Sequence, residues 1–422
     1  MKKQRGASTL RKSVGLLTAL LLCLSWFSPA QQTLRQFPAR LSLTAGQMRT
    51  LTLGAPLTLT PVTGQLAVNA SQDERLRNQG AVELLSEASG TSELLLSLFG
   101  LVPIKRVEVD VSPETRLIPG GQAVGVAMQL NGVLVVGLGD TDGASPAKAS
   151  GIQPGDVLRQ VNGVDVTSAQ QLARLIAQSG AQPLPIAFDR NGTLLHATLT
   201  PALDAATGTA RMGAWVRDST AGVGTLSFYD PAKGRYGALG HAITDGDTGQ
   251  VLPVGQGQVL AAQVVAVQKG KRGLPGELKG SFLRQAQVLG DIRTNSTLGI
   301  YGTLDTPCVN PLYPDGVPIG LRGSVHTGKA AILSTVDGQG VRAYEVEITR
   351  LFDQSSPAPK SMILRVTDPA LLAKTGGIVQ GMSGSPILQD GRIIGAVTHV
   401  FVSDPTQGYG LYIDWMLEQA AQ

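Results

Sequence analysis

The sequence predicts a mainly β protein built from two or three domains. Its 422 residues are too many for one ordinary domain. It contains 52 Gly and 24 Pro but only 4% aromatic residues, and short apolar runs alternate with polar residues between turn-forming clusters. This pattern is typical of strands and turns rather than of a helical bundle. Hydrophobic residues make up 42% of the chain and charged residues 16%, a balance that supports packed cores.

The N-terminus has the layout of an export signal. Residues 1–30 contain five basic residues and no acid, and an apolar run covers residues 14–27 before Ser28, Pro29 and Ala30. A basic region, a short apolar region and a small-residue exit together predict a signal peptide over residues 1–30. The run is short for a membrane span, although an uncleaved signal anchor remains the alternative. In either case we expect the rest of the chain outside the cytoplasm.

Charge and cysteine content argue against two classes of protein. Beyond the leader, 30 basic residues face 31 acidic ones, so we expect no nucleic-acid partner. Of the two cysteines, Cys23 lies in the leader, which leaves Cys308 without a partner for a structural disulfide. We expect Cys308 to be a small buried apolar residue.

Residues 37–111 alternate apolar and polar side chains in short runs. Examples are residues 40–43 (Arg-Leu-Ser-Leu), 57–60 (Leu-Thr-Leu-Thr) and 105–111 (Lys-Arg-Val-Glu-Val-Asp-Val). Alternation with a period of two predicts strands that bury one face. No residues with recognisable chemistry accompany these strands. We therefore predict a small β-domain that spaces or docks the rest of the chain.

Residues 114–200 carry a specific set of motifs. They are Ser-Pro-Ala at 145–147, Gly-Ile-Gln-Pro-Gly-Asp-Val-Leu at 151–158 and Val-Asn-Gly at 161–163. Together they closely resemble a bacterial PDZ domain. The resemblance implies that an extended peptide adds to a sheet edge, and that backbone amides of a Gly-containing loop hold its terminal carboxylate.

The resemblance also implies a groove between that loop and one helix. The loop corresponds to residues 121–126, and the helix to residues 168–178. The groove would then be formed by Gly121, Val124, Gly125 and Val126 of the loop and by Leu172, Leu175 and Ile176 of the helix. For the three helix residues, packing in the core is an equally open role.

A segment rich in Ala, Thr and Pro, residues 201–211, is predicted to link this block to a last domain, residues 212–422. The last domain contains short strands at regular spacing, for example residues 222–228, 330–336 and 362–366. Short strands with turns between them over about 210 residues fit a β-barrel or a pair of barrels.

Ser383 is the candidate nucleophile of the last domain. It lies in residues 381–388 (Gly-Met-Ser-Gly-Ser-Pro-Ile-Leu), between small residues that leave its hydroxyl open to attack on a substrate. Gly381 and Gly384 allow the backbone to curl, so that the amides of Ser383 and Gly381 face a developing oxyanion. A simple strand-joining turn is the alternative, because Gly, Ser and Pro dominate turns.

A serine nucleophile needs a base, and the chain contains four histidines, at positions 196, 241, 326 and 399. His241 is the best candidate because a predicted strand ends just before it and its neighbours are small. It lies in residues 240–249 (Gly-His-Ala-Ile-Thr-Asp-Gly-Asp-Thr-Gly). His399, on the strand behind Ser383, is the alternative base or a lining residue of the cleft. A histidine at a strand end is also often only a satisfied polar residue.

These motifs, together with Gly-Ala-Val-Thr-His-Val at 395–400, resemble the SpoIVB-type serine peptidases, the stage IV sporulation protein B family. The resemblance implies a chymotrypsin-like double β-barrel. It also implies an exported peptidase of sporulation signalling, acting in the space between the forespore and mother-cell membranes. Such a peptidase would cut itself, in its own N-terminal segment, and a membrane-bound inhibitor of the protease that processes the sigma-K factor.

The resemblance further implies that Asp368 is the acid of a catalytic triad that orients the imidazole. Two alternatives remain open on the residues alone. A double barrel normally draws this acid from the chain between its barrels, which would favour Asp291 or Asp305. Asp368 also precedes Pro369 and fits a turn-capping role.

We expect no cofactor and no metal. The acids of residues 245–247 (Asp-Gly-Asp) are too few for a calcium loop. Two rival functions remain: a quality-control protease of the HtrA kind, in which the PDZ block normally follows the catalytic domain, and a non-enzymatic peptide-binding scaffold. The presence of both His241 and Ser383 argues against the scaffold.

Overall fold

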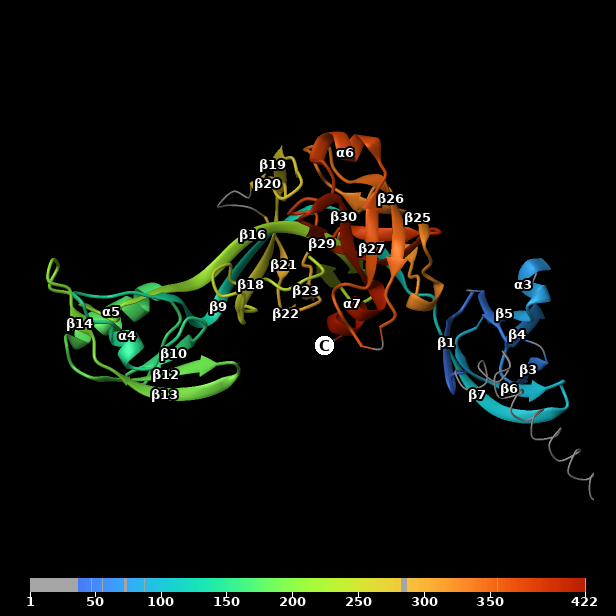
Figure 1. Ribbon diagram of the computed structural model, residues 1–422, viewed down its shortest axis with the longest axis horizontal. Helices are drawn as coiled ribbons and strands as arrows, with labels where there is room; N and C mark the ends of the chain where they lie inside the picture. Colours follow the sequence, from blue (N-terminus) through green and yellow to red (C-terminus); the bar gives the residue numbers. More distant parts are fainter. Residues whose placement is uncertain are drawn as a thin grey trace, which may run out of the picture. The chain divides into compact units, whose positions relative to one another are not determined.

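A computed structural model describes residues 37–421 except 47, 55, 72–73, 87, 282–286 and 355 (Figure 1). The predicted signal segment, residues 1–30, lies outside the described residues. Contacts divide the chain into two compact units, Met1–Thr115 and Arg116–Gln422. In the described part of the chain, no helix is long and apolar enough to cross a membrane.

The first unit consists of two small sheets and one short helix. The larger sheet has the order β1-β7-β6-β3 and the smaller one β2-β5-β4. The elements are β1 (Arg40–Thr44), β2 (Arg49–Thr52), β3 (Leu57–Thr63), β4 (Leu66–Ala70), α3 (Glu74–Asn78), β5 (Ala81–Ser86), β6 (Gly90–Leu98) and β7 (Val102–Ser112). Apolar side chains at alternate positions, such as Val107 and Val109 of β7, are fully buried between them, as period-two alternation predicts.

The block that resembles a PDZ domain surrounds a core of its own. Its elements are α4 (Pro146–Ala149), β10 (Val157–Val161), β11 (Val164–Asp165), α5 (Ala169–Ser179), β12 (Leu184–Arg190) and β13 (Thr193–Leu199). Leu172 and Ile176 of α5 pack into this core with Leu158 and Phe188. The side chain of Asp156, nearly fully buried, is held by two hydrogen bonds of 2.7 Å from Arg190.

Two long strands connect this block to the barrels. β9 (Ala123–Leu138) and β16 (Ala214–Asp230) are antiparallel partners from Ala123↔Thr225 to Leu138↔Ala214. Figure 1 shows them running side by side from the block to the barrels. One end of each strand therefore lies in the block that resembles a PDZ domain, and the other end lies in the first barrel.

The first barrel is an open, mixed arrangement of short strands around β9 and β16. Its further strands are β8 (Arg116–Pro119), β17 (Arg235–Ala238), β18 (Val254–Ala261), β21 (Val288–Asp291), β22 (Thr294–Ser296), β23 (Gly299–Thr303) and β24 (Val317–Pro318). A separate hairpin, β19 (Gln263–Gln268) and β20 (Glu277–Ser281), lies beside it. The core of the first barrel contains the buried residues Val124, Tyr236, Val259 and Ile300.

The second barrel is closed, with the strand order β25-β26-β27-β30-β29-β28. Its elements are the short 3₁₀ helix η1 (Arg322–Ser324), β25 (Gly328–Ser334), β26 (Arg342–Leu351), β27 (Met362–Val366), α6 (Pro369–Thr375), β28 (Pro386–Gln389), β29 (Arg392–Phe401), β30 (Asp404–Tyr412) and α7 (Ile413–Ala420). The predicted fold class is therefore confirmed: a mainly β chain with a small N-terminal β-domain, a PDZ domain and a chymotrypsin-like double barrel.

The boundaries between these parts differ from the predicted ones. Residues 116–130, predicted to begin the PDZ block, form β8 and the first half of β9, which pair with β24, β16 and β18 of the first barrel. Residues 201–211, predicted to be a linker, form the hairpin β14 (Ala202–Leu203) and β15 (Ala210–Arg211). The PDZ block is thus inserted between two strands of the first barrel.

Candidate active site

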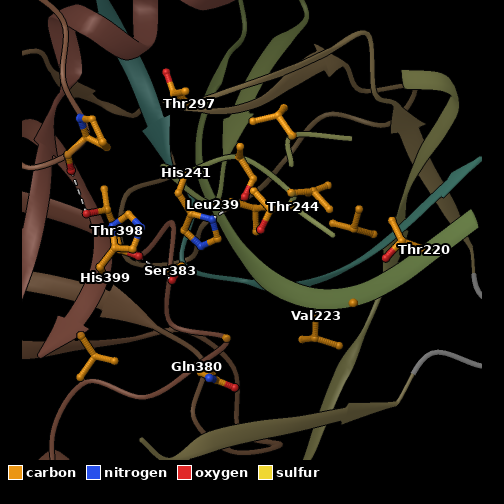
Figure 2. Close-up of a pocket in the computed structure, with 18 of the residues that line it drawn as sticks. Thr220, Val223, Leu239, His241, Thr244, Thr297, Gln380, Ser383, Thr398 and His399 are labelled. Carbon is orange, nitrogen blue, oxygen red and sulfur yellow. Dashed lines mark hydrogen bonds between the residues drawn. The ribbon is translucent and has the colours of Figure 1, made fainter. Parts of the chain in front are cut away.

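A cavity of about 790 Å³ lies at the meeting point of the two barrels. Its walls come from β16, from the loop after β17 and from the turn before β28. Three side chains with catalytic chemistry line it: His241, Ser383 and His399. Figure 2 shows these three side chains gathered at one end of the cavity. The structure therefore brings the predicted nucleophile and the predicted base to one site.

The turn that carries Ser383 is held by strand β16. Thr225 of β16 donates from its amide to the carbonyl of Ser383 (3.0 Å) and from its hydroxyl to the carbonyl of Gly381 (2.7 Å). Gly381 and Gly384 have φ of 92° and 97°, a region that favours glycine. A Cβ at Gly384 would lie 2.0 Å from the carbonyl oxygen of Thr225. Only glycine allows so close an approach.

Two backbone amides at the turn have no hydrogen-bond partner within the described part of the chain. The neighbouring amides are used: Met382 donates to Val379, and Gly384 donates to Val397. Among the hydrogen bonds of the described residues, none is donated by the amides of Gly381 or Ser383. Free amide donors at the nucleophile and two residues before it are the components of an oxyanion hole. The predicted pair, Gly381 and Ser383, thus has the donors that this role requires.

The hydroxyl of Ser383 is bonded to the backbone rather than to an imidazole. It donates a 2.8 Å hydrogen bond to the carbonyl oxygen of Thr398, on β29. A carbonyl can accept a proton in a hydrogen bond but cannot remove it. The geometry is therefore that of a resting site, in which the hydroxyl must leave Thr398 before it can attack a substrate.

His241 follows β17 through a tight backbone turn. Leu239 and Gly240 both have positive φ, of 68° and 69°, and for the branched Leu239 this conformation is strained. The Nδ1 atom of His241 lies 2.8 Å from the carbonyl oxygen of Ala242. A carbonyl only accepts, so Nδ1 carries the proton of the neutral ring and Nε2 keeps a free lone pair. Burial lowers the pKa of His241, partly opposed by this hydrogen bond.

His399 is the second imidazole of the site. Its ring centroid lies 5.1 Å from that of His241, with the rings tilted by 39°. Its Nδ1 atom is buried and, within the part of the chain that the structure describes, has no hydrogen-bond partner. Burial above all, with the nearby His241 and Lys360, lowers the pKa of His399 to about 4. His399 is therefore neutral at physiological pH.

Asp368 lies at the N-terminus of α6, where its carboxylate accepts hydrogen bonds from the backbone. Its Oδ1 accepts from the amide of Leu371 (2.9 Å) and its Oδ2 from that of Glu345 (3.4 Å). These contacts are those of a helix cap, the alternative that the sequence left open. Among the described residues, no carboxylate is hydrogen-bonded to His241. The carbonyl of Ala242, rather than an acid, fixes the tautomer of the base.

The two alternative acids do not take that place either. Asp291 accepts from the amide and hydroxyl of Thr303 and pairs with Arg293, and neither it nor Asp305 lines the cavity. The other histidines are also elsewhere: His196 lies on β13, and exposed His326 pairs with Asp390 at 2.9 Å. No residue pattern could predict that a carbonyl occupies the position of the acid, because backbone geometry leaves no signature in the residue types.

The loop after His241 is braced from two sides. The buried carboxylate of Asp245 is paired with Arg217 of β16 and accepts from the amide and hydroxyl of Thr248. Asp247 pairs with Arg217 at 3.0 Å. Across the described residues, no group of three or more His, Cys, Asp or Glu side chains is placed to hold a metal ion. The acids of this loop act as structural anchors.

The predicted peptide groove needs correction. Val124 and Val126 pair on both sides, with β16 and β18, and Gly121 lies against the second barrel, where its carbonyl accepts from Thr335. Gly125 is in the same paired strand. Amides that are already bonded within a sheet cannot hold a peptide carboxylate. These four residues are therefore not part of the groove beside α5.

The structure shows a different wall for this groove. A cavity of about 490 Å³ lies between α5 and the segment 209–216, lined by Leu172, Ile176, Met212 and Trp215 among others. Leu175 is half-buried against the same core. In the described chain, no strand pairs with the outer edge of β16 at Ala214–Arg217, which leaves an edge open for strand addition. The sequence signal missed was a Gly between apolar residues, Met212-Gly213-Ala214, just before a strand.

Comparison with known proteins identifies two parts of the chain. Residues 208–417 match the family model described as SpoIVB peptidase S55, and residues 142–190 match the PDZ domain model. A putative zinc metalloprotease of Treponema pallidum is 26% identical over 126 residues. The match covers 28% of this chain and 28% of that protein, so the chain spans only about a quarter of its relative.

Two solved structures are similar at low identity. The active form of the Rv3671c protease from M. tuberculosis is 16% identical, covers 48% of this chain and 74% of that chain, and has a TM-score of 0.29. The PDZ domain of an SdrC-like protein from Listeria monocytogenes is 20% identical, covers 20% of this chain and 87% of that chain, and has a TM-score of 0.18.

The family match and the site coincide. The segment that matches the peptidase family contains His241, Ser383 and both unpartnered amides, and the segment that matches the PDZ model contains α5. Residues 208–417 therefore resemble the SpoIVB peptidase S55 family, and residues 142–190 resemble PDZ domains.

Proposed function

We propose that this protein is an exported serine endopeptidase of sporulation signalling. It cleaves itself and a membrane-bound regulator of sigma-factor processing, and its PDZ domain controls peptide recognition. The observation that carries the endopeptidase part is the convergence of Ser383, His241 and the free amides of Gly381 and Ser383 on one open cavity. The signal layout of residues 1–30 and the family resemblance support the export and sporulation parts.

The proposed chemistry is acyl transfer. The Oγ of Ser383 leaves Thr398 and attacks the peptide carbonyl, while Nε2 of His241 takes its proton. The amides of Gly381 and Ser383 donate to the oxygen on which negative charge develops. His241 then gives the proton to the leaving amine, so that the peptide C–N bond breaks and an acyl-enzyme remains. Water, deprotonated by the same imidazole, hydrolyses the ester and restores Ser383.

In this scheme, two neutral groups take the place of the acid of a catalytic triad. The carbonyl of Ala242 holds the proton of Nδ1, which fixes the tautomer in which Nε2 accepts. His399 packs its ring 5.1 Å from the base and excludes water from that side. A dipole stabilises the imidazolium less than a buried carboxylate does, so we expect turnover to be slow until a substrate or ligand rearranges the site.

The control by the PDZ domain has a physical route in β16. The outer edge at Ala214–Arg217 forms one wall of the groove beside α5. At the end of this edge, Arg217 pairs with Asp245 in the loop after His241. Further along the same strand, Thr225 is hydrogen-bonded to the turn that carries Ser383. A peptide that pairs with the edge of β16 therefore acts on a strand that contacts both catalytic loops. We propose that such a peptide releases Ser383 from Thr398.

The proposal is tested by determining the N-terminus of the exported protein in the wild type and in Ser383→Ala. The wild type is expected to show a second, internally cut N-terminus and to react with a fluorophosphonate probe at Ser383. The variant is expected to show neither, with turnover reduced by at least ~10⁴-fold, and to keep its melting temperature because the side chain is small and partly exposed. Internal cutting that persists in Ser383→Ala would contradict the proposal.

A further inference from the structure

The hairpin between β6 and β7 ends in four exposed large apolar side chains. They are Phe99 (69% exposed), Leu101 (84%), Val102 (56%) and Ile104 (38%), here called the apolar tip. Exposed apolar residues that occur singly are ordinary, but contiguous patches mark contact surfaces. Figure 1 shows this hairpin, in cyan, extending from the larger sheet of the first unit. The apolar tip is therefore a candidate binding surface.

The core of the first unit does not need these side chains. Leu94 and Leu96 of β6 and Val107 of β7, just behind the tip, are fully buried. The tip itself has a defined backbone: the amide of Phe99 donates to Pro56 and that of Leu101 to Leu98. Phe99 has a φ of 53°, a conformation that is rare for a bulky residue. The hairpin holds Phe99 outward at a conformational cost, although burying it in the core would gain free energy.

The place where the described chain begins points to the partner. The ammonium of Lys105, at the base of the tip, donates to the carbonyl of Phe37 at 2.7 Å. The described chain therefore begins beside the hairpin. In the sequence, the apolar run of residues 14–27 ends ten residues before Phe37, a distance of at most ~35 Å in an extended chain. A bilayer that holds this run is within reach of the tip.

We propose that the apolar tip inserts into the outer surface of the lipid bilayer from which the N-terminal segment emerges. One short apolar segment gives weak or reversible attachment, and a second contact makes attachment stable. The basic side chains at the base of the tip are already engaged: Lys105 binds Phe37, and Arg106 pairs with Glu93 at 3.0 Å. Burial of apolar surface therefore drives insertion.

The test uses the full chain reconstituted in phosphatidylcholine vesicles, with an environment-sensitive fluorophore on Leu101→Cys. Cys23→Ser removes the competing thiol, and burial raises the pKa of Cys308 to about 11, which keeps it unreactive. The matched control is Leu274→Cys, because Leu274 is also a strongly exposed leucine, in the other unit, at 67% against 84% for Leu101. Brominated lipid is added as a quencher inside the bilayer and iodide as a quencher in water.

The expected result is a blue shift at position 101, quenching by brominated lipid and protection from iodide, with none of these at position 274. Phe99→Ser with Ile104→Ser is expected to abolish the quenching at position 101 by brominated lipid. Free access of iodide to position 101 would overturn the proposal. So would protection from iodide without quenching by brominated lipid, because that result means that a protein surface covers the tip.

Discussion

At the scale of single residues, the site consists of a base and a nucleophile that share a cavity but are not yet hydrogen-bonded. Each is bonded to a backbone carbonyl instead, Ser383 to Thr398 and His241 to Ala242. The hydrogen bond to Thr398 engages the hydroxyl proton of Ser383. The hydrogen bond to Ala242 leaves Nε2 of His241 able to accept a proton. The imidazole is thus set for catalysis while the hydroxyl is not, which locates the activating step at the rotation of the Ser383 side chain.

The pH profile is the first prediction at this scale. Burial lowers the pKa of His241 below the ordinary value of 6.5, so the ring stays neutral, and able to accept a proton, down to more acidic pH. Because protonation removes the base, kcat/KM for a chromogenic peptide is expected to fall only as the pH drops through a midpoint below 6.5. The pKa of His399 is lowered to about 4, so this second ring stays neutral near pH 6.5. A midpoint above 6.5 would contradict the assignment of His241.

Asp368 gives the second prediction. Because Asp368 caps α6, Asp368→Asn is expected to keep both turnover and stability, since Asn caps a helix as well as Asp does. Asp368→Ala is expected to lose about 1 kcal/mol of unfolding free energy with turnover nearly unchanged. Peptide hydrolysis and thermal melting of both variants measure this. A loss of orders of magnitude in Asp368→Asn, with an unchanged melting temperature, would restore Asp368 as the acid of a triad.

At the scale of elements, β16 is the strand on which the site depends. It contributes a wall of the catalytic cavity, a wall of the α5 groove, and the two hydrogen bonds that shape the nucleophile turn. Thr225→Val keeps the shape of the side chain but removes the bond from its hydroxyl to Gly381. The oxyanion amide of Gly381 then loses its fixed position.

For Thr225→Val, turnover is expected to fall by about fivefold, in line with roughly 1 kcal/mol per hydrogen bond. Thr58→Val is the matched control, because its hydroxyl also donates to a strand carbonyl, that of Ser97, but in the other unit. Both variants are measured by peptide hydrolysis and by thermal melting. Equal turnover in the two variants would mean that Thr225 does not position the oxyanion donors.

The groove beside α5 gives the prediction for the PDZ domain. Ala173 is exposed and lines this groove, whereas Ala177, one turn later on the same helix, is exposed but does not line it. Ala173→Arg is expected to weaken peptide binding by at least tenfold through steric blocking and to abolish any effect of that peptide on hydrolysis. Ala177→Arg is expected to change neither. Titration of a fluorescent peptide and assays of hydrolysis with and without it measure both effects.

At the scale of the whole molecule, the sequence predicts the types of element far better than their connections. Alternating residues such as Val107 and Val109, and the motif around Ser383, report on local structure and chemistry, and the structure agrees with them. The first half of β9 was predicted to belong to the PDZ block rather than to the first barrel, because apolar residues such as Val124 and Val126 fit the core of either one. Which barrel or groove they face depends on partners nearly a hundred residues away, at Gly222 and Gly224. No local pattern encodes that choice.

The insertion of the PDZ block has a consequence for the order of events during folding. Arg116, on the first strand of the double barrel, is hydrogen-bonded to Gly316, and the two residues are separated by 200 positions. Contacts so distant in the chain form late, because the long loop between them must first be closed. The first barrel is therefore completed only after the chain has been made as far as Gly316. A product of interrupted synthesis that ends before Gly316 lacks this contact as well as Ser383.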